Sequence, residues 1–131
     1  MMPFYGDVDQ FKQAVTSVLE QSDRGFRLVV VDDGYPSDEP REWLAALADD
    51  RVQYLRNVQN LGVNGNFRRC AELVIADRFV VMGCDDVMLP GYLAAVRALS
   101  AAHPDAAVIA PGVEVIDTDD RVVRPLGDRI K

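Results

Sequence analysis

Two pairs of adjacent carboxylates are the clearest candidates for chemistry in this sequence. Asp32-Asp33 and Asp85-Asp86 each follow a run of apolar residues that is typical of a buried strand. Adjacent carboxylates repel one another unless a cation or hydrogen-bond donors compensate their charge. Mg²⁺ and Mn²⁺ bind one or two carboxylates together with phosphate oxygens and water. Asp85-Asp86 is therefore a candidate metal site, although an Asx-turn or a helix N-cap before Pro90 would use the same residues.

Asp32-Asp33 allows a second kind of chemistry. A carboxylate at the end of a strand can accept hydrogen bonds from a nucleobase N–H or from a ribose hydroxyl. The residue that follows, Gly34, is equally typical of a turn, and a turn would explain the pair without any ligand. From this segment alone both interpretations stay open.

A polar, glycine-containing loop, residues 60–66, lies between the two pairs in the sequence. It leads into a predicted helix, so its backbone N–H groups could face a phosphate. It matches neither the Walker loop nor the dinucleotide-binding fingerprint. Arg68 and Arg69 follow, and one of them could reach a pyrophosphate or a base, whereas an exposed helix face is the ordinary place for the other.

The elements that must position these residues alternate between helix and strand. The spacing of apolar residues predicts helices beginning at Val8, after Pro40, over 65–76 and from Pro90 to about His103. Strands are predicted over 26–31, 52–55, 79–82 and 107–110, and a hairpin over 113–123. Strands separated by helices favour a mostly parallel sheet covered on both faces, and ligands bind beyond the carboxyl ends of such strands. Both acidic pairs fall at those ends.

The composition restricts the classes of function. At 131 residues, with 49% hydrophobic and 27% charged residues, the chain is expected to be one soluble globular domain. Its net charge of −7 argues against a nucleic-acid partner, and it favours a divalent metal if the ligand is phosphorylated. One histidine and two cysteines are too few for a zinc site. The sequence shows neither a membrane-spanning run nor a signal peptide, so a cytoplasmic location is expected.

Several short motifs, in order and at matching spacing, make the sequence resemble the family 2 glycosyltransferases of the GT-A fold. The matching stretches are Pro3-Phe4-Tyr5, the end of the first predicted helix at residues 17–21, residues 29–34, Arg56-Asn57, residues 60–63, Gly65-Asn66 and residues 82–93. The resemblance extends to about Ile109. It implies an α/β protein of three layers, α/β/α, with a mostly parallel, Rossmann-like central sheet. It also implies that residues 1–131 form a single nucleotide-sugar-binding domain.

On the nucleotide side, the resemblance implies roles for four residues. Pro3 and Tyr5 lie where the family contacts the nucleobase. Asp32 and Asp33 match the pair that binds uracil, or its equivalent, and the ribose. The donor implied in this way is a nucleotide sugar of the UDP or dTDP type.

On the phosphate side, the resemblance implies that Asn64 and Arg68 lie near the base and the phosphates. Asp85 matches the last aspartate of the Asp-x-Asp motif, which meets Mg²⁺ or Mn²⁺ and the donor phosphates. Asp86 is expected to share this role. The sequence departs from the motif at Gly83, which stands in place of its first aspartate.

The reaction implied by the resemblance is transfer of the sugar to a hydroxyl of a glycan or lipid-linked acceptor, with inversion. Polysaccharide or cell-envelope glycan synthesis is the implied setting, with the full-length protein peripheral at the inner face of the membrane. The alternative is a nucleotide-binding or assembly module of the same fold without transfer. A phosphoacceptor receiver domain is a third interpretation, but it needs a lysine after a late strand, which neither Lys12 nor Lys131 can supply.

Two parts of the family pattern are expected to be missing. Only two residues precede Pro3, so we predict that the first strand is absent and that a tag segment, a neighbouring chain or a rearranged sheet fills the gap. The open sheet edges would then allow two copies to pair as a homo-oligomer. The acceptor-side half with the general base is expected beyond Lys131, so no catalytic residue is nominated. The hairpin aspartates are interpreted as turn residues: Asp117, Asp119 and Asp120.

Overall fold

The computed structural model describes residues 1–117, 119 and 121–123. Its elements follow in the order β1 (Met2–Phe4), α1 (Val8–Leu19), β2 (Leu28–Asp32), α2 (Glu39–Ala46), β3 (Val52–Arg56), α3 (Gly62–Glu72), α4 (Tyr92–Ala102), β4 (Val115–Ile116) and β5 (Val122–Val123). The chain divides into two compact units, Met1–Ala94 and Ala95–Lys131. Both acidic pairs belong to the first unit.

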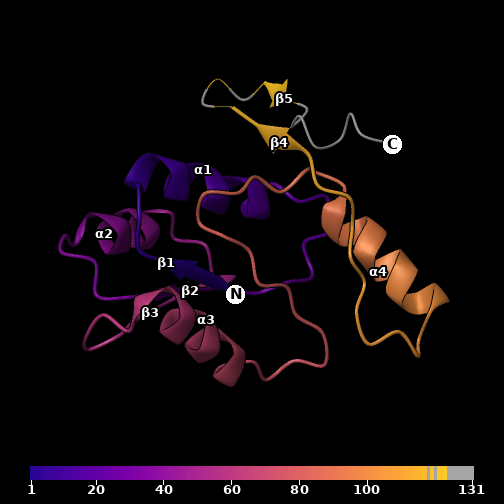
Figure 1. Cartoon of the computed structure of the whole chain (residues 1–131), viewed down its shortest axis with the longest axis horizontal. Helices are drawn as coiled ribbons and strands as arrows, with labels where there is room; N and C mark the ends of the chain where they lie inside the picture. The colour runs from indigo at the N-terminus through magenta and orange to yellow at the C-terminus, as the bar shows by residue number, and fades with distance from the viewer. Residues whose placement is uncertain (118, 120, 124–131) are drawn as a thin grey trace. The chain divides into compact units, whose positions relative to one another are not determined.

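The first unit is built on a parallel sheet with the strand order β1-β2-β3. Figure 1 shows α1 and α2 on one side of these strands and α3 on the other. Every residue of β2 is buried, as a central strand covered on both faces requires. The predicted α/β fold, with helices on both faces of a parallel sheet, is confirmed for this part of the chain.

Alternate residues of the central strand supply the two halves of the core. Leu28 and Val30 pack with α1 and α2, in one cluster that includes Phe11 and Leu44. Val29 and Val31, which alternate with them along the strand and face the other side of the sheet, pack against α3 in a second cluster. The period of two along the strand therefore holds helices on both faces of the sheet.

The prediction that the first strand is missing is wrong. Met2–Phe4 forms β1, buried along its whole length, and it pairs in parallel with β2 from Met2 opposite Val30 to Phe4 opposite Asp32. On its other side, the Met1 N–H donates to the Val80 carbonyl at 2.9 Å, and Met82 N–H donates to the Met1 carbonyl at 3.1 Å. Three residues suffice because Met2 and Phe4 are fully buried. The gap between β2 and residues 80–82 is therefore already filled, and pairing of two copies stays a prediction.

Two of the predicted strands are not strands in the structure. Residues 79–82 run beside Met1, but this contact is too short to form a ladder, and Phe79 is half exposed. Residues 107–110 form no strand, and Val108 lies open to solvent. Both segments have the apolar composition of a strand. Neither has a long enough backbone partner, which composition alone cannot reveal.

The helix predicted over 65–76 begins and ends earlier, as α3 (Gly62–Glu72). Its start is moved by local turn chemistry, because the Asn60 side chain accepts a hydrogen bond from Gly62 N–H at 2.9 Å. Gly62 has a φ of 73°, which favours glycine. The loop expected over 60–66 is therefore mostly the first turn of a helix.

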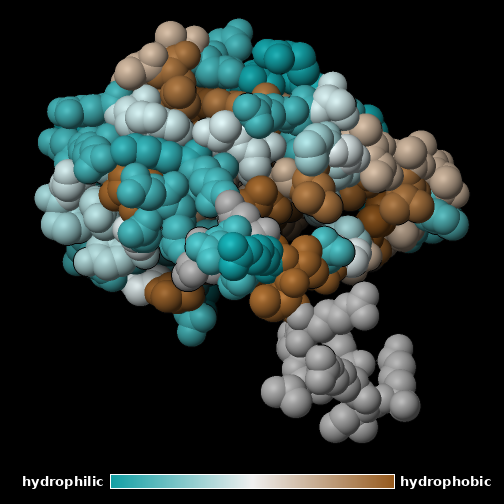
Figure 2. All heavy atoms as spheres, turned by 90° about the horizontal axis from the view of Figure 1, so that it is seen from above, coloured by the Kyte–Doolittle hydropathy of each residue, from teal (hydrophilic) through white to brown (hydrophobic). Residues whose placement is uncertain are grey.

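The second unit contains most of α4 and the hairpin of β4 and β5, which pair antiparallel. The predicted hairpin is confirmed. Asp117 Oδ1 accepts hydrogen bonds from the N–H groups of Asp119 and Arg121, so Asp117 and Asp119 are turn residues as expected. Asp120 lies outside the described residues. Figure 2 shows hydrophobic side chains gathered on the exposed surface of α4, none of whose residues is buried. In the part of the chain that the structure describes, no helix is long and apolar enough to span a membrane.

Candidate functional site

The candidate site lies at the carboxyl ends of the parallel strands. Hydrogen bonds to both neighbouring strands continue past the carboxyl end of β2, because Asp33 N–H donates to the Phe4 carbonyl at 2.9 Å and Asn57 N–H donates to the Asp32 carbonyl at 2.8 Å. The first acidic pair is thereby fixed between the end of β1 and the end of β3. This is the edge at which parallel α/β sheets bind ligands.

Asp32 is fully buried, and protein donors occupy both of its carboxylate oxygens. Tyr35 N–H donates to Oδ1 at 2.7 Å, and the Tyr54 hydroxyl donates to Oδ2. The Arg56 guanidinium lies 3.9 Å from Oδ2 and supplies a compensating charge. Burial, together with the hydrogen bond to Asp32, raises the pKa of Tyr54, which keeps this phenol protonated as a donor. A turn and two side chains of β3 therefore account for Asp32 without a ligand.

Asp33 is also buried, but its partners come from a different part of the chain. The Asn57 side-chain amide donates to Oδ1 at 2.8 Å, and Leu61 N–H donates to the same oxygen at 2.8 Å. The next residue, Gly34, has a φ of 75°, and a Cβ there would lie 3.4 Å from the Asn60 nitrogen. The chain must turn sharply at this point, which orients Asp33 toward the loop after β3.

Asp85 and Asp86 have the opposite environment, because both side chains are exposed. Their carboxylates turn toward Gly83: a Cβ at this glycine would lie 2.7 Å from Asp85 Oδ1 and 2.8 Å from Asp86 Oδ2. Two carboxylate oxygens thus converge on the place that the missing side chain of Gly83 would occupy. Glycine at the position of the motif's first aspartate therefore leaves room for these two carboxylates to approach one another.

This arrangement fits a cation that is shared with a ligand. Mg²⁺ and Mn²⁺ accept one or two carboxylates and complete their shells with phosphate oxygens and water. Among the described residues, no group of three or more histidine, cysteine or acidic side chains is placed to hold a metal. The donors present suit an open site at Asp85 and Asp86, rather than a closed cage made by protein alone.

Tyr5 and Gly6 link the two acidic pairs. The half-exposed Tyr5 ring meets the Tyr35 ring edge-on, with 5.8 Å between centroids, and Tyr35 follows the first pair by two residues. The next residue, Gly6, lies against the Cys84 thiol, because a Cβ at Gly6 would lie 3.7 Å from the sulfur, and Cys84 immediately precedes the second pair. Burial raises the pKa of that thiol, so Cys84 is a neutral packing residue and not a nucleophile.

Comparison with known proteins decides the family. Residues 1–128 match the family described as Glycosyl transferase family 2. The chain belongs to glycosyltransferase family 2. A similar protein is Uncharacterized protein MT1568 of Mycobacterium tuberculosis (strain CDC 1551 / Oshkosh), which is 33% identical over 92 residues. The match covers 70% of this chain and 28% of that protein, so the chain spans well under half of the relative's length.

In this family 2 domain, one side chain of α1 and one just beyond its C-cap hold the segment that follows the second acidic pair. Gln21, which is 3% exposed, donates from Nε2 to the Leu89 carbonyl at 2.8 Å, and its Oε1 accepts from Leu93 N–H at 3.0 Å. Ser17 Oγ accepts from Met88 N–H at 2.9 Å. Sequence reasoning assigned neither residue this role. The available signal was that Ser17 and Gln21 follow the buried Ala14 and Val18 by three residues, so they continue the apolar side of the helix with polar residues.

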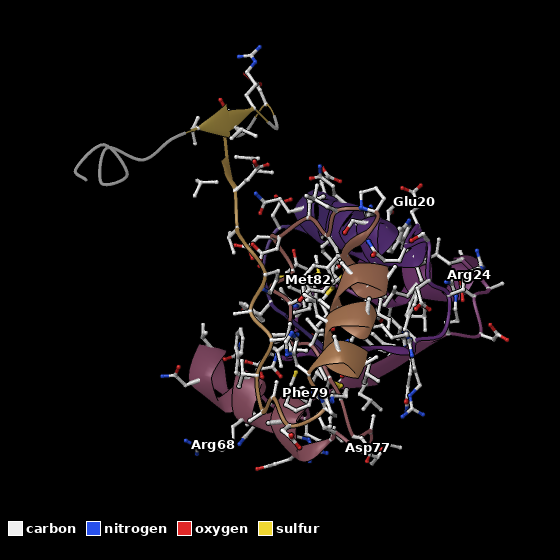
Figure 3. All side chains as sticks on the ribbon, turned by 90° about the vertical axis from the view of Figure 1, so that its right-hand side faces the viewer. Glu20, Arg24, Arg68, Asp77, Phe79 and Met82 are labelled. Carbon is white, nitrogen blue, oxygen red and sulfur yellow. The ribbon has the colours of Figure 1, made fainter. Side chains whose placement is uncertain are left out.

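The remaining predicted residues of the family 2 site are spread over its edge. Pro3 is buried within β1, whereas Asn64 and Arg68 are exposed on α3. Figure 3 shows Arg68 at the outer margin and Met82 in the interior. The N–H groups of the loop expected to face a phosphate are partly used already, because Leu61 N–H bonds Asp33 and Gly62 N–H bonds Asn60. Sequence reasoning missed Tyr35 and Tyr54, and it gave no role of their own to Arg56, Asn57 and Asn66, which it found only as parts of motifs.

Proposed function

We propose that this chain binds the nucleotide-sugar donor of a glycosyltransferase. The observation that carries the proposal is the position of the Tyr5-Gly6 segment, where the Tyr5 ring contacts Tyr35 after the first pair and Gly6 lies against Cys84 before the second pair. A nucleoside diphosphate has a base at one end and phosphates at the other. An exposed aromatic ring between a buried carboxylate and an exposed acidic pair suits that shape.

The proposed division of roles follows from burial. Tyr5 stacks on the nucleobase, because its ring is half exposed and held edge-on by Tyr35. Asp33 binds the base or the ribose, while Asp32 holds the framework because both its oxygens already accept protein hydrogen bonds. UDP- or dTDP-type donors are the proposed class. Pro3, Asn64 and Arg68 are proposed to border the nucleotide.

The phosphates are proposed to bind at Asp85 and Asp86 together with Mg²⁺ or Mn²⁺. A diphosphate would be repelled by these two exposed carboxylates and by the net charge of −7, so a cation must join them. When bound, the cation would neutralise the charge that develops on the departing nucleoside diphosphate. The carboxylates hold and orient this end of the donor.

The complete reaction is proposed to be inverting transfer to a hydroxyl of a glycan or lipid-linked acceptor. In direct displacement, the acceptor oxygen bonds to the anomeric carbon as the bond to the diphosphate breaks, and a general base takes the hydroxyl proton. No residue is nominated for that base. A role in polysaccharide or cell-envelope glycan synthesis, in the cytoplasm or at the inner face of the membrane, is part of the same proposal.

Calorimetric titration tests the donor site. UDP, dTDP, GDP, CDP and ADP are titrated with Mn²⁺ and then with EDTA, and the tightest binder is titrated into Asp85→Asn and Asp86→Asn. We expect binding that needs Mn²⁺ and weakens about tenfold or more in each variant, because each loses a charged ligand. Asp50→Asn is the matched control, because Asp50 is also an exposed aspartate next to another aspartate, just before β3. This variant should bind the nucleotide as tightly as the parent does. Failure of all five nucleotides to bind would refute the proposal.

A further inference from the structure

Behind Asp33 lies a hydrogen-bonded network that joins three segments of the first unit. Asn57, in the loop after β3, donates from Nδ2 to Asp33 Oδ1 at 2.8 Å and to Asn66 Oδ1 at 3.0 Å. Asn66, on α3, donates in turn from its own Nδ2 to the Val31 carbonyl at 2.9 Å. Asn66 is 3% exposed, so the network connects β2, the loop and α3 away from solvent.

The direction of every hydrogen bond in this network is determined. A side-chain amide nitrogen carries two hydrogens, and Asn57 uses one for each of its two acceptors. Turning the Asn57 amide over would place its oxygen against a carboxylate and an amide oxygen, which is unfavourable. The same reasoning fixes Asn66, since its nitrogen must face the Val31 carbonyl. Two donors therefore converge on Asp33 Oδ1, the Asn57 side-chain amide and the Leu61 N–H.

The network has a consequence for the ligand edge of the sheet. The side-chain torsions of Asp33 could otherwise rotate its carboxylate. Hydrogen bonds from Asn57 and Leu61 to Oδ1 hold that carboxylate in a single orientation. Asn66 fixes Asn57, and its own amide is already engaged, because its oxygen accepts from Asn57 and its nitrogen donates to the Val31 carbonyl. A carboxylate held before the ligand arrives loses less entropy on binding than one that must be ordered.

We propose that Asn57 and Asn66 are positioning residues of the nucleotide site, which act by fixing the carboxylate of Asp33. The inference rests on the proposed donor function. It predicts that these two amides contribute to recognition of the nucleoside and not to recognition of the diphosphate. Asn57 is the stronger contributor because it contacts Asp33 directly, whereas Asn66 acts through Asn57.

The test compares two ligands on the same variants. The affinity of UDP is measured with Mg²⁺, and the affinity of inorganic pyrophosphate is obtained by its competition with UDP. For Asn57→Ala we expect UDP affinity to fall about tenfold or more, from the loss of two buried hydrogen bonds, while pyrophosphate affinity stays within about twofold. Asn66→Ala should show a smaller change in the same direction. Gln53→Ala removes an exposed amide on β3 and should match the parent for both ligands.

The ratio of the two affinities separates positioning from general damage. Partial unfolding lowers both affinities together and leaves their ratio unchanged, so thermal melts accompany each titration. If Asn57→Ala does not fold, Asn57→Ser carries the test, because its hydroxyl can serve one of the two acceptors. A folded variant with the parental ratio overturns this inference alone. A parent that binds no nucleoside diphosphate, or whose UDP is not displaced by pyrophosphate, overturns the proposed donor site and the inference with it.

Discussion

The two acidic pairs of this protein have the same residues and the same place after an apolar run, yet their environments are opposite. Asp32 and Asp33 are buried, and five donor groups of the protein surround or contact them. Asp85 and Asp86 are exposed and converge on the space left by Gly83. A carboxylate that the fold has already compensated stabilises structure, whereas an uncompensated pair attracts a cation. The same dipeptide therefore has two different environments, for which we propose two different roles.

The largest contrast should appear in stability, when the same substitution is made in each pair. Asp32→Ala leaves the Tyr54 hydroxyl and the Tyr35 N–H without their acceptor and should lower the free energy of unfolding by about 3 kcal/mol. Asp85→Ala should change it by less than about 0.5 kcal/mol. Urea unfolding followed by circular dichroism measures both. Equal losses in the two variants would remove the distinction between the pairs.

A smaller effect is expected when the space between Asp85 and Asp86 is filled. In Gly83→Ala the new Cβ would lie within 3 Å of one oxygen from each carboxylate, so the carboxylates must separate. We expect Mn²⁺-dependent nucleotide affinity to fall about three- to tenfold, with little change in the melting temperature. Gly91→Ala, where a Cβ has nothing within 4 Å, is the matched control. Unchanged affinity in Gly83→Ala would show that the convergence of the carboxylates is irrelevant to binding.

The smallest effect concerns the phenol that compensates Asp32. The pKa of Tyr54 is raised in the folded protein, mainly by burial, so its stabilising contribution is complete below the unfolded pKa of about 10 and is lost as the pH rises toward the folded value. Tyr54→Phe should cost about 1 kcal/mol at neutral pH. Above pH 10, the difference in unfolding free energy between parent and variant should shrink. A difference that stays constant from pH 7 to pH 11 would argue against the hydrogen bond to Asp32.

Much of the fold could be predicted from the sequence because its signals are local. The apolar spacing from Val8 predicted α1, and the run before Asp32 predicted β2. The first acidic pair was placed correctly at a strand end, whereas the second pair follows a segment that forms no strand. The first strand was predicted to be absent because the strand length typical of the family was expected. In the structure a three-residue strand is sufficient, since Met2 and Phe4 are both fully buried. Its partner on the outer side, residues 80–82, lies far away in the sequence.

The difference between the two pairs could not be predicted, for a physical reason. Apart from the Tyr35 N–H, the donors that compensate the first pair come from β3 and the following loop. Only folding brings Tyr54 to Asp32 and Asn57 to Asp33. Nothing local distinguishes a tyrosine that faces a carboxylate from one that faces the core. Likewise, the sequence indicated that glycine at position 83 removes one carboxylate ligand. The structure shows that the carboxylates of Asp85 and Asp86 occupy the space that a side chain at position 83 would need.

Paramagnetic line broadening tests the central claim most directly. Uniformly labelled protein is titrated with Mn²⁺ in the presence of UDP, and the backbone amide signals are followed by heteronuclear NMR. If Asp85 and Asp86 hold the cation with the donor phosphates, the signals of residues 83–86 should broaden first, with Tyr5 next, and this order should require UDP. Broadening that begins at another acidic segment, such as Asp49-Asp50 or Asp117-Asp119, or that is the same without UDP, would contradict the account.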